Sequence, residues 1–211
     1  MHFLDRSDAG KKLARALFAK YKEKDVVVFG LPRGGVITAF EVSKKLKAPL
    51  NIVITRKIGH LRQPEYALAA VSENGHLVGK EEEVKLIDKV WFEKEVKKEQ
   101  KEAKRRKKLY LSGRKSAKVA GKIVIIVDDG IATGLTIKAA IREIQHHNPK
   151  FVVVAAPVAP LDTVYELQKE ADDVVILHKA SNFYAIGQYY DSFEQVSDEE
   201  VIHILEKAGR G

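Results

Sequence analysis

The sequence predicts an α/β fold, in which a twisted parallel sheet carries helices on both faces. The first observation is that short, continuously apolar runs alternate with helix-favouring stretches, which is typical of parallel sheets. The second is the absence of cysteine, which excludes a disulfide scaffold, a thiolate nucleophile and a cysteine-based zinc site. The third is the length of 211 residues, 45% of them hydrophobic, which suffices for one substantial core. We expect residues 1–211 to form a single domain.

Five apolar runs are predicted to be the strands of this sheet. In chain order they are Val26–Phe29, Leu50–Thr55, Ile123–Val127, Phe151–Ala156 and Val174–Leu177. Helical connections between successive strands predict right-handed crossovers and therefore a parallel arrangement. Ligands of such sheets bind at the carboxyl ends of the strands, so the residues that directly follow each strand are the candidates for function.

The predicted helices follow from apolar residues spaced three and four apart. They cover Lys11–Tyr21, Ile37–Leu46, Leu135–Gln145 and Leu161–Lys169. A further helix is expected near the C-terminus, because Ser197 and Glu200 have the spacing of a capping box. Together with the strands, these helices account for most of the chain outside one long connection.

That connection lies between the second and third predicted strands and interrupts the alternation. Asn74-Gly75 predicts a two-residue hairpin turn. Glu81–Leu111 is a long, charged, helix-favouring stretch that ends before Gly113, and as one helix it would measure roughly 45 Å at 1.5 Å per residue. Apolar residues mark one face of its first half only (Val84, Ile87 and Trp91), so we expect that half to pack and the second half to be solvated.

Positive charge is concentrated in the same connection. The chain carries a net charge of +8, and residues 80–118 hold 15 Lys and Arg against 8 Asp and Glu, or +7. We interpret residues 80–118 as a basic helical insertion on a nearly neutral body. Its role is open between a lid over a reaction site, an oligomerisation arm that uses the apolar face, and a solvated insert.

The most informative segment is IVIIVDDGIATGLT, at residues 123–136. An apolar strand leads directly into Asp128 and Asp129, whose carboxylates can accept hydrogen bonds from the vicinal hydroxyls of a sugar. The small residues of loop 132–136 expose backbone N–H groups at the start of a helix, which is an arrangement that binds anions. Two carboxylates beside an anion site fit a ribose 5-phosphate, and the alternative is an ordinary strand–helix turn.

This segment resembles the phosphoribosyl-pyrophosphate motif of the type I phosphoribosyltransferases, in which two acids after an apolar strand precede Thr-Gly-x-Thr. The resemblance implies that Asp128 and Asp129 are catalytic residues at the ribose. It implies that the 5-phosphate is bound by Ala132, Thr133, Gly134, Leu135 and Thr136. The implied reaction transfers ribose 5-phosphate from phosphoribosyl pyrophosphate to a nucleobase-like acceptor and releases pyrophosphate.

The resemblance extends along most of the chain, from FLDRSDAGKKLA through LPRGGV and TRKIG to the tail FYAIGQYYDSFEQVSDEEV. As a whole the chain is similar to a poorly characterised group of predicted phosphoribosyltransferases. In the family, the loop after the first strand binds pyrophosphate, which implies this role for Arg33, Gly34 and Gly35. Arg56 and Lys57, after the second strand, are implied to lie near the pyrophosphate. The alternatives are a plain turn for the first group and a solvated strand end for the second.

The resemblance also implies Mg²⁺ as a cofactor, because Mg²⁺ binds pyrophosphate oxygens with few protein ligands. No direct protein ligand to the metal is expected. Ala132 stands where hypoxanthine and guanine enzymes of the family carry Asp, which disfavours a 6-oxopurine acceptor. In the family a small hood built from the chain ends covers the acceptor. Here Phe183, Tyr184 and Tyr190 are candidates to stack on a planar base, and packing in the core is the alternative.

A second class of function stays open at this point. A regulator that senses phosphoribosyl pyrophosphate or a nucleotide could bind nucleic acid through Arg105, Arg106, Lys107 and Lys108. We disfavour it because no aromatic residues interleave this run and charged helices are commonly solvated. No apolar run approaches the ~20 residues that cross a bilayer, and the N-terminus lacks signal-peptide features, which predicts a cytoplasmic protein without a membrane partner. We further expect a homo-oligomer, most simply a dimer.

Overall fold

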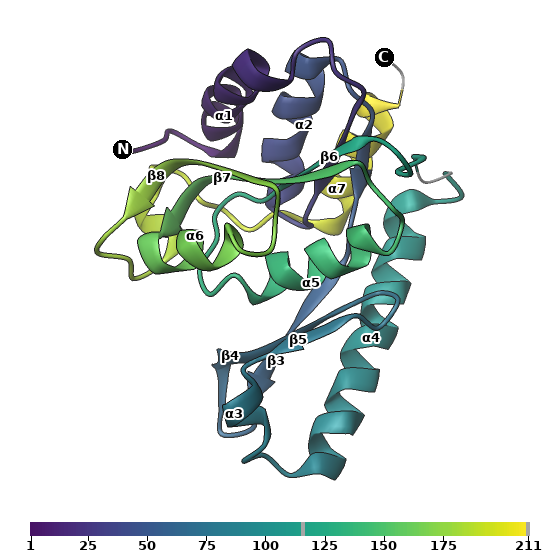
Figure 1. Ribbon diagram of the computed structural model, residues 1–211, viewed down its shortest axis with the longest axis vertical. Coiled ribbons are helices and arrows are strands. Elements are labelled where there is room, and N and C mark those ends of the chain that lie inside the picture. Colours follow the sequence, from purple (N-terminus) through teal and green to yellow (C-terminus); the bar gives the residue numbers. More distant parts are fainter. Residues whose placement is uncertain (115–116, 210–211) are drawn as a thin grey trace.

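The central sheet has five strands, all parallel, in the order β2-β1-β6-β7-β8 (Figure 1). The computed structural model describes residues 1–114 and 117–209. The strands are β1 (Val26–Gly30), β2 (Leu50–Ile52), β6 (Ile123–Val127), β7 (Phe151–Pro160) and β8 (Asp173–Ala180). This arrangement confirms the parallel α/β fold that the sequence predicts.

Helices cover both faces of the central sheet. On one face lie α1 (Arg6–Tyr21) and α2 (Gly35–Leu46), and on the other lie α5 (Leu135–Gln145) and α6 (Leu161–Leu167). Successive residues of β6 serve the two faces in turn, since Ile125 packs toward α1 and α2 whereas Ile126 packs toward α5 and α6. Burial on both sides explains why the strand sequences are continuously apolar.

A second, antiparallel sheet of three strands lies beside the first, in the order β3-β4-β5. It consists of β3 (Thr55–His60), β4 (Gln63–Ser72) and β5 (Leu77–Gly79). The predicted hairpin joins β4 to β5 at Asn74-Gly75, but the two-residue turn is wrong, because residues 73–76 form the connection and the N–H of Gly75 donates to the carbonyl of Ser72 at 3.0 Å. The expected strand Leu50–Thr55 is therefore wrong at its end, because the parallel strand stops at Ile52 and Thr55 already belongs to β3. Only Ile58 of β3 is fully buried, so no apolar pattern marks this strand in the sequence.

The helix-favouring stretch over residues 81–111 is helical, but it does not form one helix. The structure divides it into α3 (Glu81–Val84) and α4 (Lys89–Leu111). Asp88 starts the second helix by accepting a hydrogen bond from the backbone N–H of Trp91 at 2.7 Å, which is the geometry of an N-cap. Residues 115 and 116 of the expected insertion lie outside the described residues.

Helix α4 is not half solvated, because its two halves pack on different parts of the molecule (Figure 1). Near its start, Trp91 and Phe92 cover Ile58 and Leu68 of the second sheet. Val84 and Ile87 belong to the same cluster, so the face expected for an oligomerisation arm is packed within the chain. Further along, Ala103 and Tyr110 join a cluster with residues of β2 and of α7 (Asp198–Ala208). Helix α4 therefore connects the two sheets.

The chain ends meet at the carboxyl edge of the central sheet. Phe3 forms an isolated parallel bridge with Tyr190, which directly follows the short 3₁₀ helix η1 (Ile186–Tyr189). Ser197 caps α7 as expected, since its hydroxyl accepts a hydrogen bond from the N–H of Glu200 at 3.1 Å. Among the described residues, no helix is both long and apolar enough to cross a membrane.

Candidate functional site

Asp128 and Asp129 follow β6 at the carboxyl edge of the central sheet, as the sequence predicts. Arg6, the first residue of α1, donates a hydrogen bond from Nε to Oδ2 of Asp129 at 2.6 Å. The side chains of this ion pair are only 11% and 12% exposed. The N–H of Asp129 donates to Oδ1 of Asp128 at 2.9 Å. One carboxylate is thus neutralised by a guanidinium, whereas the other is held by the backbone.

This difference gives the two acids unlike electrostatic environments. Desolvation, with the neighbouring Asp129 carboxylate second, raises the pKa of Asp128 well above its usual range. The hydroxyl of Tyr190 donates to the backbone carbonyl of Asp129 at 2.5 Å, and desolvation raises the pKa of this tyrosine as well. Asp128 is therefore the acid of the pair that gains most from an additional cation or hydrogen-bond donor.

The loop after β1 packs directly against the two acids. A Cβ atom on Gly34 would lie 1.9 Å from Oδ2 of Asp129, and one on Gly35 would lie 2.7 Å from Oδ1 of Asp128. No side chain fits at either position, so the backbone itself faces the carboxylates. The peptide bond between Pro32 and Arg33 in this loop is cis. The structure thus brings together two of the segments that the sequence singled out.

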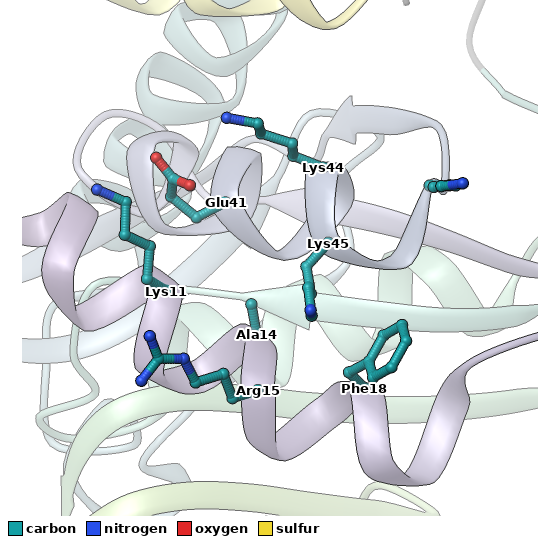
Figure 2. A pocket seen from close by; sticks show the side chains of 8 residues that line it. Lys11, Ala14, Arg15, Phe18, Glu41, Lys44 and Lys45 are labelled. Atoms are coloured by element: carbon teal, nitrogen blue, oxygen red, sulfur yellow. The ribbon is translucent and has the colours of Figure 1, made fainter.

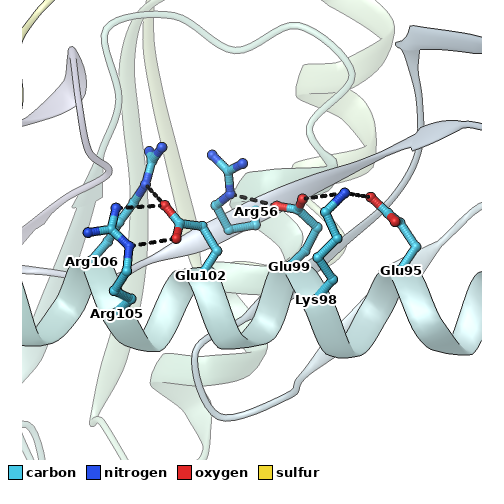
Figure 3. Close-up of polar contacts among 7 residues, drawn as sticks. All are labelled: Arg56, Glu95, Lys98, Glu99, Glu102, Arg105 and Arg106. Carbon is cyan, nitrogen blue, oxygen red and sulfur yellow. Dashed lines mark hydrogen bonds and ion pairs between the residues drawn. The ribbon is translucent and has the colours of Figure 1, made fainter.

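Arg33 and the two basic residues of β3 reach other carboxylates. Arg33 Nη1 lies 3.8 Å from Oδ1 of Asp198, the first residue of α7. Arg56 Nε donates to Glu99 of α4 at 2.8 Å (Figure 3). Lys57 Nζ donates to Glu65 at 3.0 Å. Each of these cations therefore has an acidic partner outside the pair at the end of β6.

The loop that joins β6 to α5 has the features of an anion site. Gly134 caps α5 with φ of +74°, a conformation that favours glycine. The hydroxyl of Thr163 donates to the carbonyl of Ala132 at 2.8 Å and fixes the loop on α6. The hydrogen bonds among the described residues leave the backbone N–H groups of residues 132–136 without a protein acceptor. Ala132 and Thr133 are exposed and Thr136 is half-buried, whereas Gly134 and Leu135 are buried, so the exposed edge of this set of donors lies at residues 132 and 133.

The three aromatic residues expected in the hood occupy different environments. Tyr190 is buried, and its ring lies 5.4 Å from that of Phe3 and 4.8 Å from that of Phe193. Phe183 stacks on Tyr189, whereas Tyr184 is 90% exposed. Tyr190 therefore supports the backbone beneath Asp129, while Tyr184 has a free aromatic face.

Arg6 is the site residue that the sequence interpretation missed. Besides its bond to Asp129, its Nη1 donates to the carbonyl of Glu194 at 2.7 Å, and its guanidinium lies 3.8 Å from the centroid of the Phe193 ring. The first turn of α1 and the C-terminal tail thus hold one acid in place. Arg6 stands 123 positions before Asp129, and no local pattern links the two residues.

Among the described residues, no group of three or more His, Asp or Glu side chains is arranged to hold a metal ion. Asp128 and Asp129 are the acids that directly follow a strand at this edge of the central sheet. Two adjacent carboxylates, one of them with a raised pKa, fit a cation that arrives with an anionic ligand better than they fit a permanent protein cage.

Comparisons with known proteins agree with the motif. The sequence matches the family described as phosphoribosyl transferase domain over residues 4–194. Two curated relatives from Mycobacterium tuberculosis are each 43% identical over 210 residues, "Putative phosphoribosyl transferase MT0597" of strain CDC 1551 and "Putative phosphoribosyl transferase Rv0571c" of strain H37Rv. The match covers 99% of this chain and 47% of each relative, so the chain spans about half the length of the curated relatives it matches.

A solved structure, that of TT1426 from Thermus thermophilus, has the same fold over nearly the whole length. It is 40% identical in sequence with a TM-score of 0.82, and the match covers 98% of this chain and 99% of that one. The second sheet and α4 lie within the matched length, so this similarity is not confined to the central sheet.

Proposed function

The chain belongs to the phosphoribosyl transferase family, and from that premise we propose that it transfers ribose 5-phosphate from phosphoribosyl pyrophosphate to a nucleobase-like acceptor and releases pyrophosphate. One observation carries the proposal. The acid pair after β6 touches the Gly34-Gly35 backbone and leads directly into the open amides of residues 132–136. A sugar that carries a phosphate at one end and pyrophosphate at the other fits this sequence of donors and acceptors.

Each part of the substrate has an assigned partner. The 5-phosphate accepts hydrogen bonds from the amides of residues 132–136 and from the hydroxyls of Thr133 and Thr136, at the positive end of α5. The ribose hydroxyls donate to the carboxylates of Asp128 and Asp129. The pyrophosphate lies against the backbone of Gly34 and Gly35. These contacts position carbon 1 of the sugar for attack by a ring nitrogen of the acceptor.

In this proposal the reaction is accelerated by electrostatic stabilisation of the charges that develop in the transition state. As the bond from carbon 1 to pyrophosphate loosens, positive charge grows on the sugar and negative charge grows on the leaving group. The fixed carboxylates stabilise the former, and the backbone amides of the glycine loop stabilise the latter. When bound with the substrate, Mg²⁺ would neutralise part of the charge on pyrophosphate, and Asp128 and Asp129 are the residues that would hold it through hydroxyls or water.

Arg6 and Tyr190 act as positioning residues. Arg6 fixes the carboxylate of Asp129, and Tyr190 fixes its carbonyl, so both groups resist displacement when substrate binds. Tyr184, with its exposed ring, is the residue of the expected hood that remains available to a planar acceptor. Ala132 disfavours a 6-oxopurine acceptor, because its methyl group cannot act as a base toward the purine.

Nucleic-acid regulation through α4 is disfavoured by its ion pairs (Figure 3). Glu102 accepts hydrogen bonds from both Arg105 and Arg106, and Lys107 is paired at 2.7 Å with the buried Glu73. These three cations share two carboxylates, so part of their charge is balanced within the chain. The basic run that motivated this alternative is therefore a weaker phosphate-binding surface than its composition indicates.

The test is pyrophosphate release from phosphoribosyl pyrophosphate and Mg²⁺, measured on the purified chain across a panel of nucleobases. We expect turnover with at least one acceptor, and its loss in Asp128→Asn and Asp129→Asn. Lys20→Gln, on the far end of α1, is the control and should behave as wild type. If calorimetry detects no binding of phosphoribosyl pyrophosphate to the folded wild-type chain, the proposal is wrong.

We propose that the protein works as a homodimer in the cytoplasm. The exposed apolar residues Leu86 and Val90, between α3 and the first turn of α4, are the candidates for the contact, because the neighbouring apolar face is packed on the second sheet. Sedimentation equilibrium of the wild type and of Leu86→Ser/Val90→Ser tests this. A monomeric wild type would contradict the dimer.

A further inference from the structure

A hollow of about 570 Å³ lies between α1 and α2, on the outer face of these helices (Figure 2). Its floor includes Ala14 and Phe18 of α1. Five cations surround it, and one carboxylate, Glu41, completes the lining. The cations are Lys11 and Arg15 from α1, and Lys44, Lys45 and Lys47 from the end of α2 and the residue after it.

The cations of this groove differ from other cations of the same helix. Lys12 pairs with Asp8 at 2.7 Å, and Lys20 pairs with Asp173 at 3.0 Å, although both stand on α1. In the part of the chain that the structure describes, none of the five groove cations has an ion pair or a side-chain hydrogen bond. Glu41 accepts a hydrogen bond from the Ser7 hydroxyl at 2.9 Å, so its carboxylate is directed to a neutral partner and not to a groove cation.

Helix dipoles account for only part of this charge. Lys44 and Lys45 stand in the last turn of α2, where cations are favoured for any helix. Lys11 and Arg15 stand in the middle of α1, where the dipole gives no such preference. Both sets of cations face the same hollow, so repulsion between like charges destabilises the folded chain there. An anionic ligand would reduce this repulsion.

We propose that this groove binds a ligand that carries a compact chain of two or three phosphate groups. Five cations and one carboxylate give the lining a charge of +4, which is opposite to that of a triphosphate. The volume is in the range of small-molecule sites, and it is larger than a single phosphate requires. Phe18 adds an apolar floor, with Lys45 Nζ 4.5 Å from its ring centroid.

The groove is separate from the proposed transferase site. The helices α1 and α2 begin at that site, with Arg6 and Gly35, whereas the groove cations start more than one turn later on α1 and lie in the last turn of α2 and just after it. The inference rests on charge and shape in this groove and does not depend on the proposed reaction. The phosphate chain belongs either to a free oligophosphate or to a nucleotide, and these share the same recognition chemistry.

The experiment titrates tripolyphosphate and, separately, a nucleoside triphosphate into the ¹⁵N-labelled 211-residue chain without Mg²⁺, at about 0.15 M salt, where surface fields extend ~8 Å. We expect amide shifts on residues 11–18 and 41–47. Equal affinity for the two probes assigns recognition to the phosphate chain alone, and tighter binding of the nucleotide assigns a contribution to Phe18. Shifts confined to residues 31–36 and 128–136 would overturn the inference.

Two variants that lose the same charge distinguish a phosphate-binding site in the groove from general electrostatic attraction between the ligand and the protein. Lys11→Gln/Arg15→Gln/Lys45→Gln should weaken binding at least about tenfold, because each lost contact is charge-assisted. The control Lys89→Gln/Lys98→Gln/Arg105→Gln removes the same charge from ion-paired positions on α4 and should leave the affinity unchanged. Equal weakening in both variants, or none in the first, would contradict a site in the groove.

Discussion

The central sheet and the second sheet are stabilised in different ways. Strands of the central sheet are buried on both faces by apolar side chains, and their sequences show it. The second sheet presents Ala67 and Ala70 to α5 on one side and Ile58 and Leu68 to α4 on the other. Polar contacts add to this packing, including the pair of Arg56 with Glu99. The strands of the central sheet can therefore be predicted from their regular apolar patterns. The second sheet is harder to predict, because its strands mix apolar and polar contacts.

The difference also separates the two sheets by role. The carboxyl edge of the central sheet holds the acids and the open amides, on loops that follow rigid strands. The second sheet reaches the same region from the side, because its alanine face packs on Leu135 and Ala139 at the start of α5. We infer that the central sheet supplies the chemistry of the site, and the second sheet, with α4, stabilises one wall of it.

The largest expected effect concerns the central sheet and falls on Gly134, in the loop that follows β6. Gly134→Val should abolish binding of phosphoribosyl pyrophosphate and ribose 5-phosphate, because its Cβ would lie 2.9 Å from Thr163 Cγ2 and the new side chain would crowd the loop amides. Gly121→Val is a matched control, since Gly121 has the same φ of +74° with no atom within 4 Å of its Cβ position. Calorimetry on both variants makes the comparison. Normal ribose 5-phosphate binding by Gly134→Val would refute the phosphate loop.

The next largest effect concerns the second sheet and falls on Phe92 of α4, which packs on that sheet. Phe92→Ala should lower the free energy of unfolding by about 3–5 kcal/mol, since this ring covers Ile58 and Leu68. Leu61→Ala, in the turn between β3 and β4 at a position that is 53% exposed, should change it by less than about 0.5 kcal/mol. Urea denaturation measures both. If Phe92→Ala proves as mild as Leu61→Ala, the second sheet does not depend on α4 as the packing indicates.

These two predictions rest on parts of the molecule that the sequence reveals to different degrees. Ile123–Val127 and Leu135–Gln145 are predicted to the residue, because both-sided burial leaves an unbroken apolar strand and a clear helical spacing. Strand β3 is missed because its sequence, TRKIGH, is polar at most positions. The break before α4 is missed because a single capping side chain, Asp88, creates it within a stretch that favours helix throughout.

The residues of the candidate site also differ in how far the sequence reveals them. Asp128, Asp129 and the two loops are found because their residues follow one another on the chain. Arg6 is missed because its partner is distant in sequence. The net charge of residues 80–118 does not identify the exposed cations, since pairing depends on the fold. The groove between α1 and α2 emerges only from the structure.

The third prediction sets the two acids of the site against each other. Asp128→Asn should raise the midpoint of thermal unfolding at pH 7, because the folded state then no longer holds a charge that its surroundings disfavour. Asp129→Asn should lower it, because Arg6 loses the partner of a mostly buried ion pair. Both variants should lose substrate affinity, by about 1.5–3 kcal/mol for one charge-assisted hydrogen bond.

The pH dependence tests the cause. A folded-state pKa raised above the usual 3.8 means that the unfolded chain releases its proton first as the pH rises, so Asp128 destabilises the fold progressively above that value. The advantage of Asp128→Asn should therefore be smallest below pH 3.8 and grow with pH until the folded-state pKa is passed. A constant difference across this range would show that the charge of Asp128 is not the cause.

The smallest effects compare two ion pairs on α4, both drawn in Figure 3. Arg105→Gln removes an exposed partner of Glu102 and should change the free energy of unfolding by about 0.2–1 kcal/mol. Two guanidinium groups lower the pKa of Glu102 to about 2, so this small contribution should be complete above the usual pKa of 4.5 and be lost as the pH falls from 4.5 toward 2, and it should shrink at high salt. Arg56→Gln breaks a pair whose acid, Glu99, is buried, so it should cost more, and salt should affect it less. Urea denaturation at about 0.05 and 1 M NaCl distinguishes the two. Equal costs with equal salt dependence would mean that Arg56 does not anchor α4 to the second sheet, and the contrast between the two sheets would then rest on apolar packing alone.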